Sequence, residues 1–159
     1  MSVGLVVVSH SAKIAEGVVE LAGQMAGEVR IRAAGGTDGG IGTDATLIAE
    51  AIAAADEGDG VLVLVDLGSA VLSAQLAIDE LVDQEVRGRV RISDAPVVEG
   101  TVVAAVQAST GSSLDEVDQA ARGTATMAKV KSAGPGRAGP KGVSRSADPE
   151  GGPPVDAGG

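Results

Sequence analysis

The chain has 159 residues, of which 44% are apolar, and a formal net charge of −10 at pH 7. Its length suits a single domain, and its apolar share suits a globular core. That core must be aliphatic, because the chain contains no Phe, Tyr or Trp. The negative charge and the lack of aromatic stacking platforms argue against nucleic acids and anionic membrane surfaces as partners.

The counts of cysteine and histidine limit the possible chemistry. Without cysteine the chain has no disulfide, no thiolate nucleophile and no cysteine-ligated metal, and its single histidine, His10, cannot form a multi-histidine site. We therefore expect no metal and no cofactor. The first ten residues lack a basic region and carry too short an apolar run for a signal peptide or a spanning helix. A soluble, cytoplasmic protein is expected.

Composition changes sharply near residue 134. The rest of the chain contains five of the six prolines and few large apolar residues. Such a segment buries too little surface to offset the entropy lost on ordering. The sequence therefore predicts a folded domain at residues 1–131 and a Pro/Gly-rich disordered tail or linker at residues 132–159.

Within the predicted domain, short apolar runs alternate with helical patterns. The runs have the length and β-branched character of buried strands, and they lie at residues 3–8, 29–33, 61–65 and 90–92. Helices are predicted after each of them, near residues 14–25, 44–55, 69–86 and 101–108. A capping box at Ser113–Glu116 predicts the start of one further helix, the last of the domain.

The helical patterns also predict which residues face inward. For the first helix these are Ile14, Val18, Leu21 or Ala22, and Met25. For the second they are Leu47, Ile48, Ala51 and Ile52, with Thr43 as the cap.

This alternation predicts an α/β fold with a mainly parallel, doubly wound sheet and helices on both faces. Pro96 favours a short edge strand near residues 95–99. In such folds ligands bind beyond the carboxyl ends of the strands, where the strand order reverses. The loops that matter are therefore residues 9–11, 35–43, 66–69 and 93–100.

His10 follows the first predicted strand and precedes the first helix. An imidazole with a pKa of about 6.5 is a competent nucleophile near neutral pH, and a helix start favours a phosphoryl dianion. Asp66 ends the other strong strand, and neighbouring strands lie about 5 Å apart, so its carboxylate is the natural partner that orients the ring. Ser11, Ser69 and the backbone N–H of Gly68 are candidate phosphate ligands.

Each of these residues also has a purely structural interpretation. His10 can be an ordinary residue of a helix-capping region, Asp66 can be a helix cap, and Gly68 and Ser69 can simply begin the third helix. The glycine-rich loop at residues 35–43 lacks the lysine of a P-loop and does not fit the dinucleotide fingerprint. Nucleotide binding by this chain alone is not expected.

Four segments together resemble the DhaM family, the phosphotransferase subunits of bacterial dihydroxyacetone kinases, whose first domain is similar to mannose-type EIIA domains. They are LVVVSHS at 5–11, IGTD at 41–44, VDLGSA at 65–70 and APVVEG at 95–100. The resemblance covers residues 1–131. It implies that the histidine matching His10 accepts a phosphoryl group from phospho-HPr and passes it to ADP held in DhaL. The resulting ATP then serves the third subunit, DhaK.

The resemblance also implies a homodimer, with the later part of the sheet in the interface. Some DhaM proteins continue into an HPr-like domain, and because the sequence has a single histidine we expect no such domain within these residues. The Pro/Gly-rich segment resembles the linker before such a domain, which leaves the completeness of the chain open. Two alternatives remain: a mannose-type EIIA subunit serving a sugar permease, and a non-phosphorylated regulatory module of the same fold. A histidine phosphatase or mutase ranks last, because no arginine or second histidine lies near His10 in the sequence.

Overall fold

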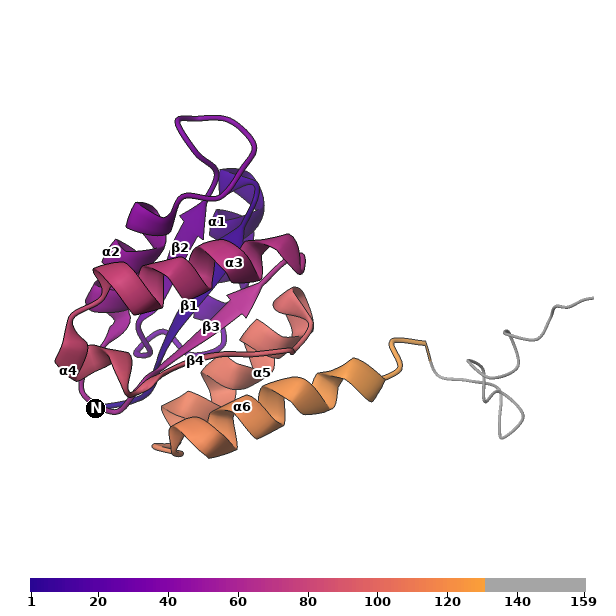
Figure 1. Ribbon diagram of the computed structural model, residues 1–159. Helices are drawn as coiled ribbons and strands as arrows, with labels where there is room; N and C mark the ends of the chain where they lie inside the picture. Colours follow the sequence, from indigo (N-terminus) through magenta and orange to yellow (C-terminus); the bar gives the residue numbers. More distant parts are fainter. Residues whose placement is uncertain (131–159) are drawn as a thin grey trace, which may run out of the picture. The chain divides into compact units, whose positions relative to one another are not determined.

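Four parallel strands form the centre of the structure, a computed structural model that describes residues 1–130 (Figure 1). They are β1 (Gly4–Ser9), β2 (Ile31–Gly35), β3 (Val61–Val65) and β4 (Val90–Ile92). Their order in the sheet is β2-β1-β3-β4, and all three pairings are parallel. The prediction of a parallel α/β fold is confirmed. The predicted tail at residues 132–159 lies outside the described residues.

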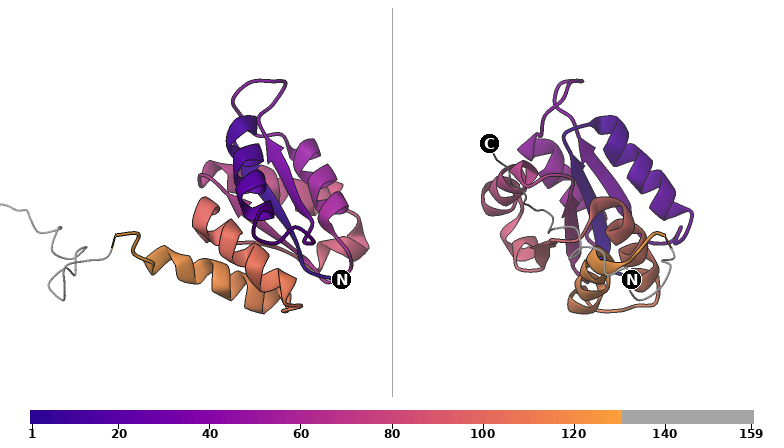
Figure 2. Two further views of the ribbon diagram at one scale, coloured as in Figure 1. Left: turned by 180° about the vertical axis from the view of Figure 1, so that it is seen from behind. Right: turned by 90° about the vertical axis from the view of Figure 1, so that its right-hand side faces the viewer.

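Helices cover both faces of the sheet (Figure 2). They are α1 (Ala12–Gly23), α2 (Ala45–Ala55), α3 (Ser69–Leu76), α4 (Gln84–Arg87), α5 (Val97–Ser109) and α6 (Leu114–Gly123). A π-helical turn, η1 (Ala77–Leu81), extends α3, and a 3-10 turn, η2 (Thr124–Thr126), follows α6. Helices α1, α5 and α6 pack on one face, and α2 with α3 and η1 packs on the other.

The two central strands are apolar along their length because both of their faces are covered. Every residue of β1 is buried, as are the first four residues of β3. Alternate residues feed the two cores: Leu5 and Val7 face α1 and α5, whereas Val6 and Val8 face α2 and α3. This is the pattern expected of strands inside a doubly wound sheet.

Helix starts follow local capping chemistry. The predicted capping box is confirmed, since Ser113 accepts the N–H of Glu116 and the Glu116 carboxylate accepts the N–H of Ser113. The predicted cap of α2 was wrong. Asp44, not Thr43, accepts the backbone N–H groups of Thr46 and Leu47, because a carboxylate one residue closer to the helix is the better-placed acceptor.

The predicted inward face of α1 was partly wrong. Ala15, Val18 and Ala22 are buried, whereas Ile14, Leu21 and Met25 are 49%, 50% and 60% exposed. The reason is the close approach of this helix to β2. A Cβ on Gly35 would lie 2.9 Å from the Cβ of Ala15, so only small side chains fit there. In α2, Ile48, Ala51 and Ile52 are buried as predicted, but Leu47 is 37% exposed.

The predicted edge strand near residues 95–99 was also wrong, because α5 begins at Val97. Pro96 is compatible with the extended residue before a helix as well as with an edge strand, and its carbonyl accepts the N–H of Gly100 as the first helical bond. The predicted helix at residues 69–86 is interrupted, since η1 ends before the extended residue Val82 and a short α4 follows.

Gly4 allows the end of α2 to contact β1, and its replacement tests this packing. A Cβ there would lie 2.1 Å from the carbonyl oxygen of Ala55. We therefore expect Gly4→Ala to lower the free energy of unfolding by about 1–3 kcal/mol, measured by urea denaturation followed by far-UV circular dichroism.

Gly17 provides the matched control, because a Cβ at this position in α1 would meet no atom within 4 Å. Gly17→Ala should raise stability by about 0.5–1 kcal/mol. Equal effects of the two substitutions would contradict the packing described here.

Candidate functional site

The candidate site lies at the point where the strand order reverses. From β1 the chain crosses to β2 on one side, and β3 lies on the other side of β1. Val8 pairs with Val65, so the next residues past each strand, His10 and Asp66, come together at the carboxyl edge of the sheet. The sheet topology thus brings together two residues that are 56 positions apart in the sequence.

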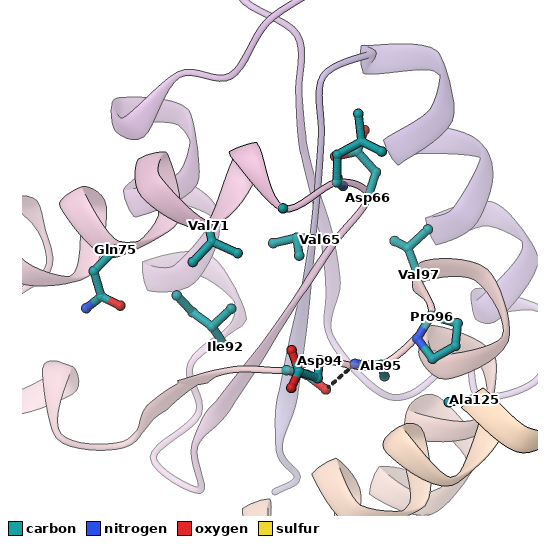
Figure 3. Close-up of a pocket in the computed structure, with 13 residues that line it drawn as sticks. Val65, Asp66, Val71, Gln75, Ile92, Asp94, Ala95, Pro96, Val97 and Ala125 are labelled. Atoms are coloured by element: carbon teal, nitrogen blue, oxygen red, sulfur yellow. Dashed lines mark hydrogen bonds between the residues drawn. The ribbon is translucent and has the colours of Figure 1, made fainter.

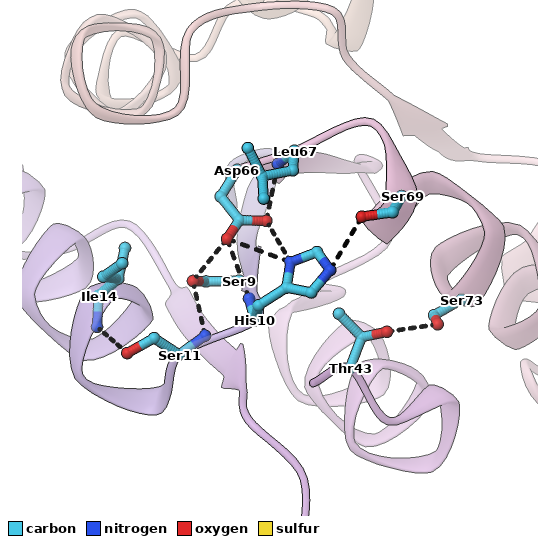
Figure 4. Close-up of polar contacts among 9 residues, drawn as sticks. All are labelled: Ser9, His10, Ser11, Ile14, Thr43, Asp66, Leu67, Ser69 and Ser73. Atoms are coloured by element: carbon cyan, nitrogen blue, oxygen red, sulfur yellow. Dashed lines mark hydrogen bonds and ion pairs between the residues drawn. The ribbon is translucent and has the colours of Figure 1, made fainter. Parts of the chain in front are cut away.

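The carboxylate of Asp66 is bonded directly to the ring of His10 (Figure 4). Nδ1 of His10 lies 3.0 Å from Oδ1 and 3.3 Å from Oδ2 of Asp66. On the other side of the ring, Nε2 lies 3.0 Å from the hydroxyl of Ser69. The predicted pairing of His10 with Asp66 is present, and the structure adds Ser69 to the ring.

The surrounding donors hold Asp66 in place. Oδ2 accepts the hydroxyl of Ser9 at 2.9 Å and the backbone N–H of His10 at 3.0 Å. Oδ1 accepts the backbone N–H of Leu67 at 2.7 Å. Burial by itself would raise the pKa of this carboxyl, but the hydrogen bonds from His10, Ser9 and Leu67 outweigh it and hold the pKa below its usual range.

An ionised Asp66 determines the tautomer of the neutral ring. A carboxylate can only accept hydrogen bonds, so Nδ1 of His10 must carry the proton that it shares with Asp66. Nε2 is then left with a lone pair, and the hydroxyl of Ser69 donates to it. The side chain of His10 is 23% exposed and that of Asp66 is 12% exposed. The arrangement supplies one oriented, solvent-accessible nitrogen nucleophile.

The other predicted phosphate ligands occupy different positions. The hydroxyl of Ser11 caps α1 by accepting the N–H of Ile14, and the N–H of Ser11 donates to Ser9. Gly68 is exposed at the start of α3, where a Cβ would meet no atom within 4 Å. Among the described contacts, Ser69 is the one of these three whose side chain bonds to the ring.

The glycine-rich loop connects β2 to α2 and projects beyond the same edge of the sheet (Figure 1). Its Gly42 N–H donates to the carbonyl of His10 at 2.8 Å. Thr43 is hydrogen-bonded to Ser73 of α3 at 2.6 Å. The loop therefore braces the backbone of the histidine and is tied to the helix that carries Ser69.

A pocket of about 520 Å³ adjoins the site beyond β3 and β4 (Figure 3). Asp66 lies on its wall, and the rest is largely aliphatic, with Val65, Leu67, Val71, Ile92 and Val97 among the lining residues. Residues 1–130 contain no cluster of three or more His, Asp or Glu side chains suited to a metal ion. In the same range, no helix is long and apolar enough to cross a membrane.

Sequence reasoning missed one member of the site, Ser9. Its side chain is fully buried and contacts Asp66. Its place at the end of a buried strand, directly before His10, is the available signal, but the sequence alone assigns it no role beyond membership of the loop at residues 9–11 and of a helix-capping region.

Comparisons with known proteins relate the chain to one family. The EIIA-man family, described as "PTS system fructose IIA component", matches residues 4–118. The phosphoryl donor subunit DhaM of the PEP-dependent dihydroxyacetone kinase of Escherichia coli (strain K12) is 47% identical over 120 residues, which cover 72% of this chain and 25% of that protein. The chain thus spans about a quarter of the length of this relative.

A shorter relative is matched along almost all of its length. The phosphoryl donor subunit DhaM of PEP-dependent dihydroxyacetone kinase 2 from Listeria innocua is 43% identical over 74% of this chain and 94% of that protein. Among solved structures, the unknown-function protein EF1359 is 36% identical, with a TM-score of 0.69, over 77% of this chain and 95% of that chain.

The low pKa of Asp66 predicts a pH dependence of stability. A carboxyl whose folded-state pKa is depressed stabilises the fold fully above its unfolded pKa, about 3.9, and loses this contribution as the pH falls through the folded value. The stability difference between the wild type and Asp66→Asn should therefore shrink as the pH is lowered from about 6 to about 3.

Urea denaturation at several pH values measures this difference. Asp59→Asn controls for the loss of one negative charge, because Asp59 is exposed and has no side-chain hydrogen bond or ion pair within residues 1–130. A difference for Asp66→Asn that grows towards acid pH would contradict the low pKa.

Proposed function

Because the chain belongs to the EIIA-man family, and within it to the DhaM subunits, we propose that it relays a phosphoryl group on Nε2 of His10. The donor is phospho-HPr, and the acceptor is ADP bound in the DhaL subunit. ATP regenerated there phosphorylates dihydroxyacetone held by DhaK. The observation that carries the proposal is the ring itself, with Nδ1 bonded to Asp66 and Nε2 directed outward.

The chemistry requires no metal or cofactor from this chain. The lone pair of Nε2 attacks phosphorus, an Nε2–P bond forms, and the N–P bond of the phosphohistidine on HPr breaks. The proton on Nδ1 stays between the ring and Asp66 throughout. In the second transfer an oxygen of the β-phosphate of ADP attacks, and the Nε2–P bond breaks. Phosphoryl transfer of this kind depends on positioning and electrostatics.

The start of α3 is the proposed cradle for the phosphoryl oxygens. The hydroxyl of Ser69 already reaches Nε2 and can donate to a phosphoryl oxygen instead. The exposed backbone of Gly68 lies beside it at the positive end of the helix. Ser11 is the weaker candidate of the three, because its hydroxyl caps α1 and its N–H donates to Ser9.

A mannose-type EIIA subunit of a sugar permease would use the same histidine chemistry. The matches to whole DhaM subunits favour the dihydroxyacetone kinase. Adding DhaL, DhaK and dihydroxyacetone to the phosphorylated chain separates the two functions. Formation of dihydroxyacetone phosphate supports the kinase, and its absence favours the permease subunit.

We expect His10→Ala to abolish phosphoryl uptake completely, because no other histidine exists in the chain. The measurement is intact mass after incubation with phosphoenolpyruvate, the general phosphotransferase enzyme and HPr. The wild type should gain one phosphoryl group that is labile to acid and stable to base.

Ser73→Ala is the matched control, since its hydroxyl pairs with Thr43 and not with the ring. It should be labelled like the wild type. An unlabelled wild type would contradict the relay and favour the alternative of a non-phosphorylated regulatory module of the same fold. Labelling of His10→Ala would also disprove the relay through His10.

A homodimer is the second part of the proposal, and the outward face of α3 supports it. The buried face of this helix consists of Ala70 and Ala74, whereas Leu72 and Leu76 on the outside are 77% and 52% exposed. A helix that is apolar on both sides is usually covered on both. Beside it, within the described sheet, β4 pairs only with β3, so the proposed interface joins α3 to the later part of the sheet.

Replacing both leucines with Gln should shift the protein from dimer to monomer in size-exclusion chromatography with light scattering. Leu21→Gln on α1, where the leucine is 50% exposed, is the control and should not change the mass. Dissociation by Leu21→Gln alone, or a wild-type monomer at all concentrations, would contradict the proposed interface.

A further inference from the structure

Ser9 is a buried polar side chain directly behind the catalytic pair, and we infer that it is a positioning residue for phosphoryl transfer that acts through Asp66. It ends β1, its side chain is 0% exposed, and its hydroxyl lies 2.9 Å from Oδ2 of Asp66. The inference rests on the proposed function, because it concerns the rate of transfer to and from His10.

The direction of this hydrogen bond is fixed by a second one. The backbone N–H of Ser11 donates to Oγ of Ser9 at 3.0 Å. The hydroxyl oxygen is thus used as an acceptor, and its proton points to the carboxylate, which can only accept. Because Ser9 is fully buried, water cannot readily replace the hydroxyl once it is removed.

Ser9 controls the carboxylate oxygen that is farther from the ring. Oδ1 faces Nδ1 of His10 at 3.0 Å and accepts the N–H of Leu67, whereas Oδ2 lies 3.3 Å from Nδ1. Without the hydroxyl, the backbone N–H of His10 is the remaining donor outside the ring to Oδ2. The carboxylate then has one restraint fewer against rotation, and it becomes a stronger competitor for the proton on Nδ1.

Among the described contacts, the ring of His10 is the titratable group bonded to Asp66. The exposed Asp94 lines the same pocket and has no described bond to Asp66. His10 contacts Oδ2 through its backbone N–H and its ring. Apart from that ring, Ser9 is the side chain that donates to Oδ2 among the described contacts, which is why we assign the orienting role to it.

Ser93 provides a close structural match without this role. It follows β4 as Ser9 ends β1, it is 3% exposed, and its Oγ accepts the N–H of Ala95 two residues later at 3.1 Å. Its hydroxyl has no described contact with Asp66. A comparison of Ser9→Ala with Ser93→Ala therefore separates the orientation of Asp66 from the loss of a buried serine.

The test combines transfer rates with NMR spectroscopy of Asp66. Single-turnover phosphoryl uptake from phospho-HPr should be roughly tenfold slower in Ser9→Ala, which corresponds to the loss of one hydrogen bond to a charged group. The carboxyl carbon signal of Asp66 should show a pKa raised relative to the wild type. Ser9→Thr, which keeps the hydroxyl, should restore both quantities, and Ser93→Ala should change neither.

Should Ser9→Ala be too unstable, Ser9→Cys keeps the test decisive, because the thiol is similar in size to the hydroxyl but only a weak donor. Like Ser9→Ala, it must slow phosphoryl uptake and raise the pKa of Asp66. Wild-type uptake rates, or an unshifted Asp66 titration, in Ser9→Ala and Ser9→Cys would overturn the inference. If the wild type itself accepts no phosphoryl group, the relay proposal fails, and the Asp66 titration still decides whether Ser9 orients the carboxylate.

Discussion

The hydrogen bond between Asp66 and Nδ1 of His10 is the interaction on which the site depends. It joins the ends of two neighbouring strands and fixes the proton on one nitrogen of the ring. Donors from Ser9, His10 and Leu67 stabilise the carboxylate as an anion. With this bond in place, a single, partly exposed imidazole has one nucleophilic nitrogen in a defined direction.

The fold makes this bond possible through close packing of small residues. A chain without aromatic side chains must build its core from aliphatic residues, and its helices approach the sheet closely at glycine and alanine. Gly35 leaves room for the backbone of Ser11 and Ala12 at the start of α1, next to His10. Gly100 in α5 leaves room for Ala95, just before that helix, since an added Cβ would lie 2.7 Å from the Cβ of Ala95. The positions of the loops at the carboxyl edge therefore follow from backbone contacts that leave no room for larger side chains.

The sequence was sufficient to predict the four strands of the sheet, with β2 placed two residues early, and the pairing of His10 with Asp66. Uninterrupted β-branched runs have few alternatives to a buried strand, and parallel strands that neighbour each other bring their carboxyl ends together. The face of α1 was not predictable in the same way, because Ile14 and Ala15 both continue a helical pattern. Only the short distance between this helix and the sheet favours Ala15 over Ile14 as the residue that faces inward. Pro96 was equally ambiguous, and Ser9 was missed because its role depends on a carboxylate 57 positions away.

The most direct test of this account is the position of the phosphoryl group on the ring. His10 is the only aromatic ring in the chain, so its signals stand alone in a nitrogen–proton correlation spectrum of the phosphorylated protein. The account predicts phosphorus on Nε2 and a proton retained on Nδ1 towards Asp66. Phosphorus on Nδ1 would show that the carboxylate does not orient the ring for transfer and would contradict the central claim.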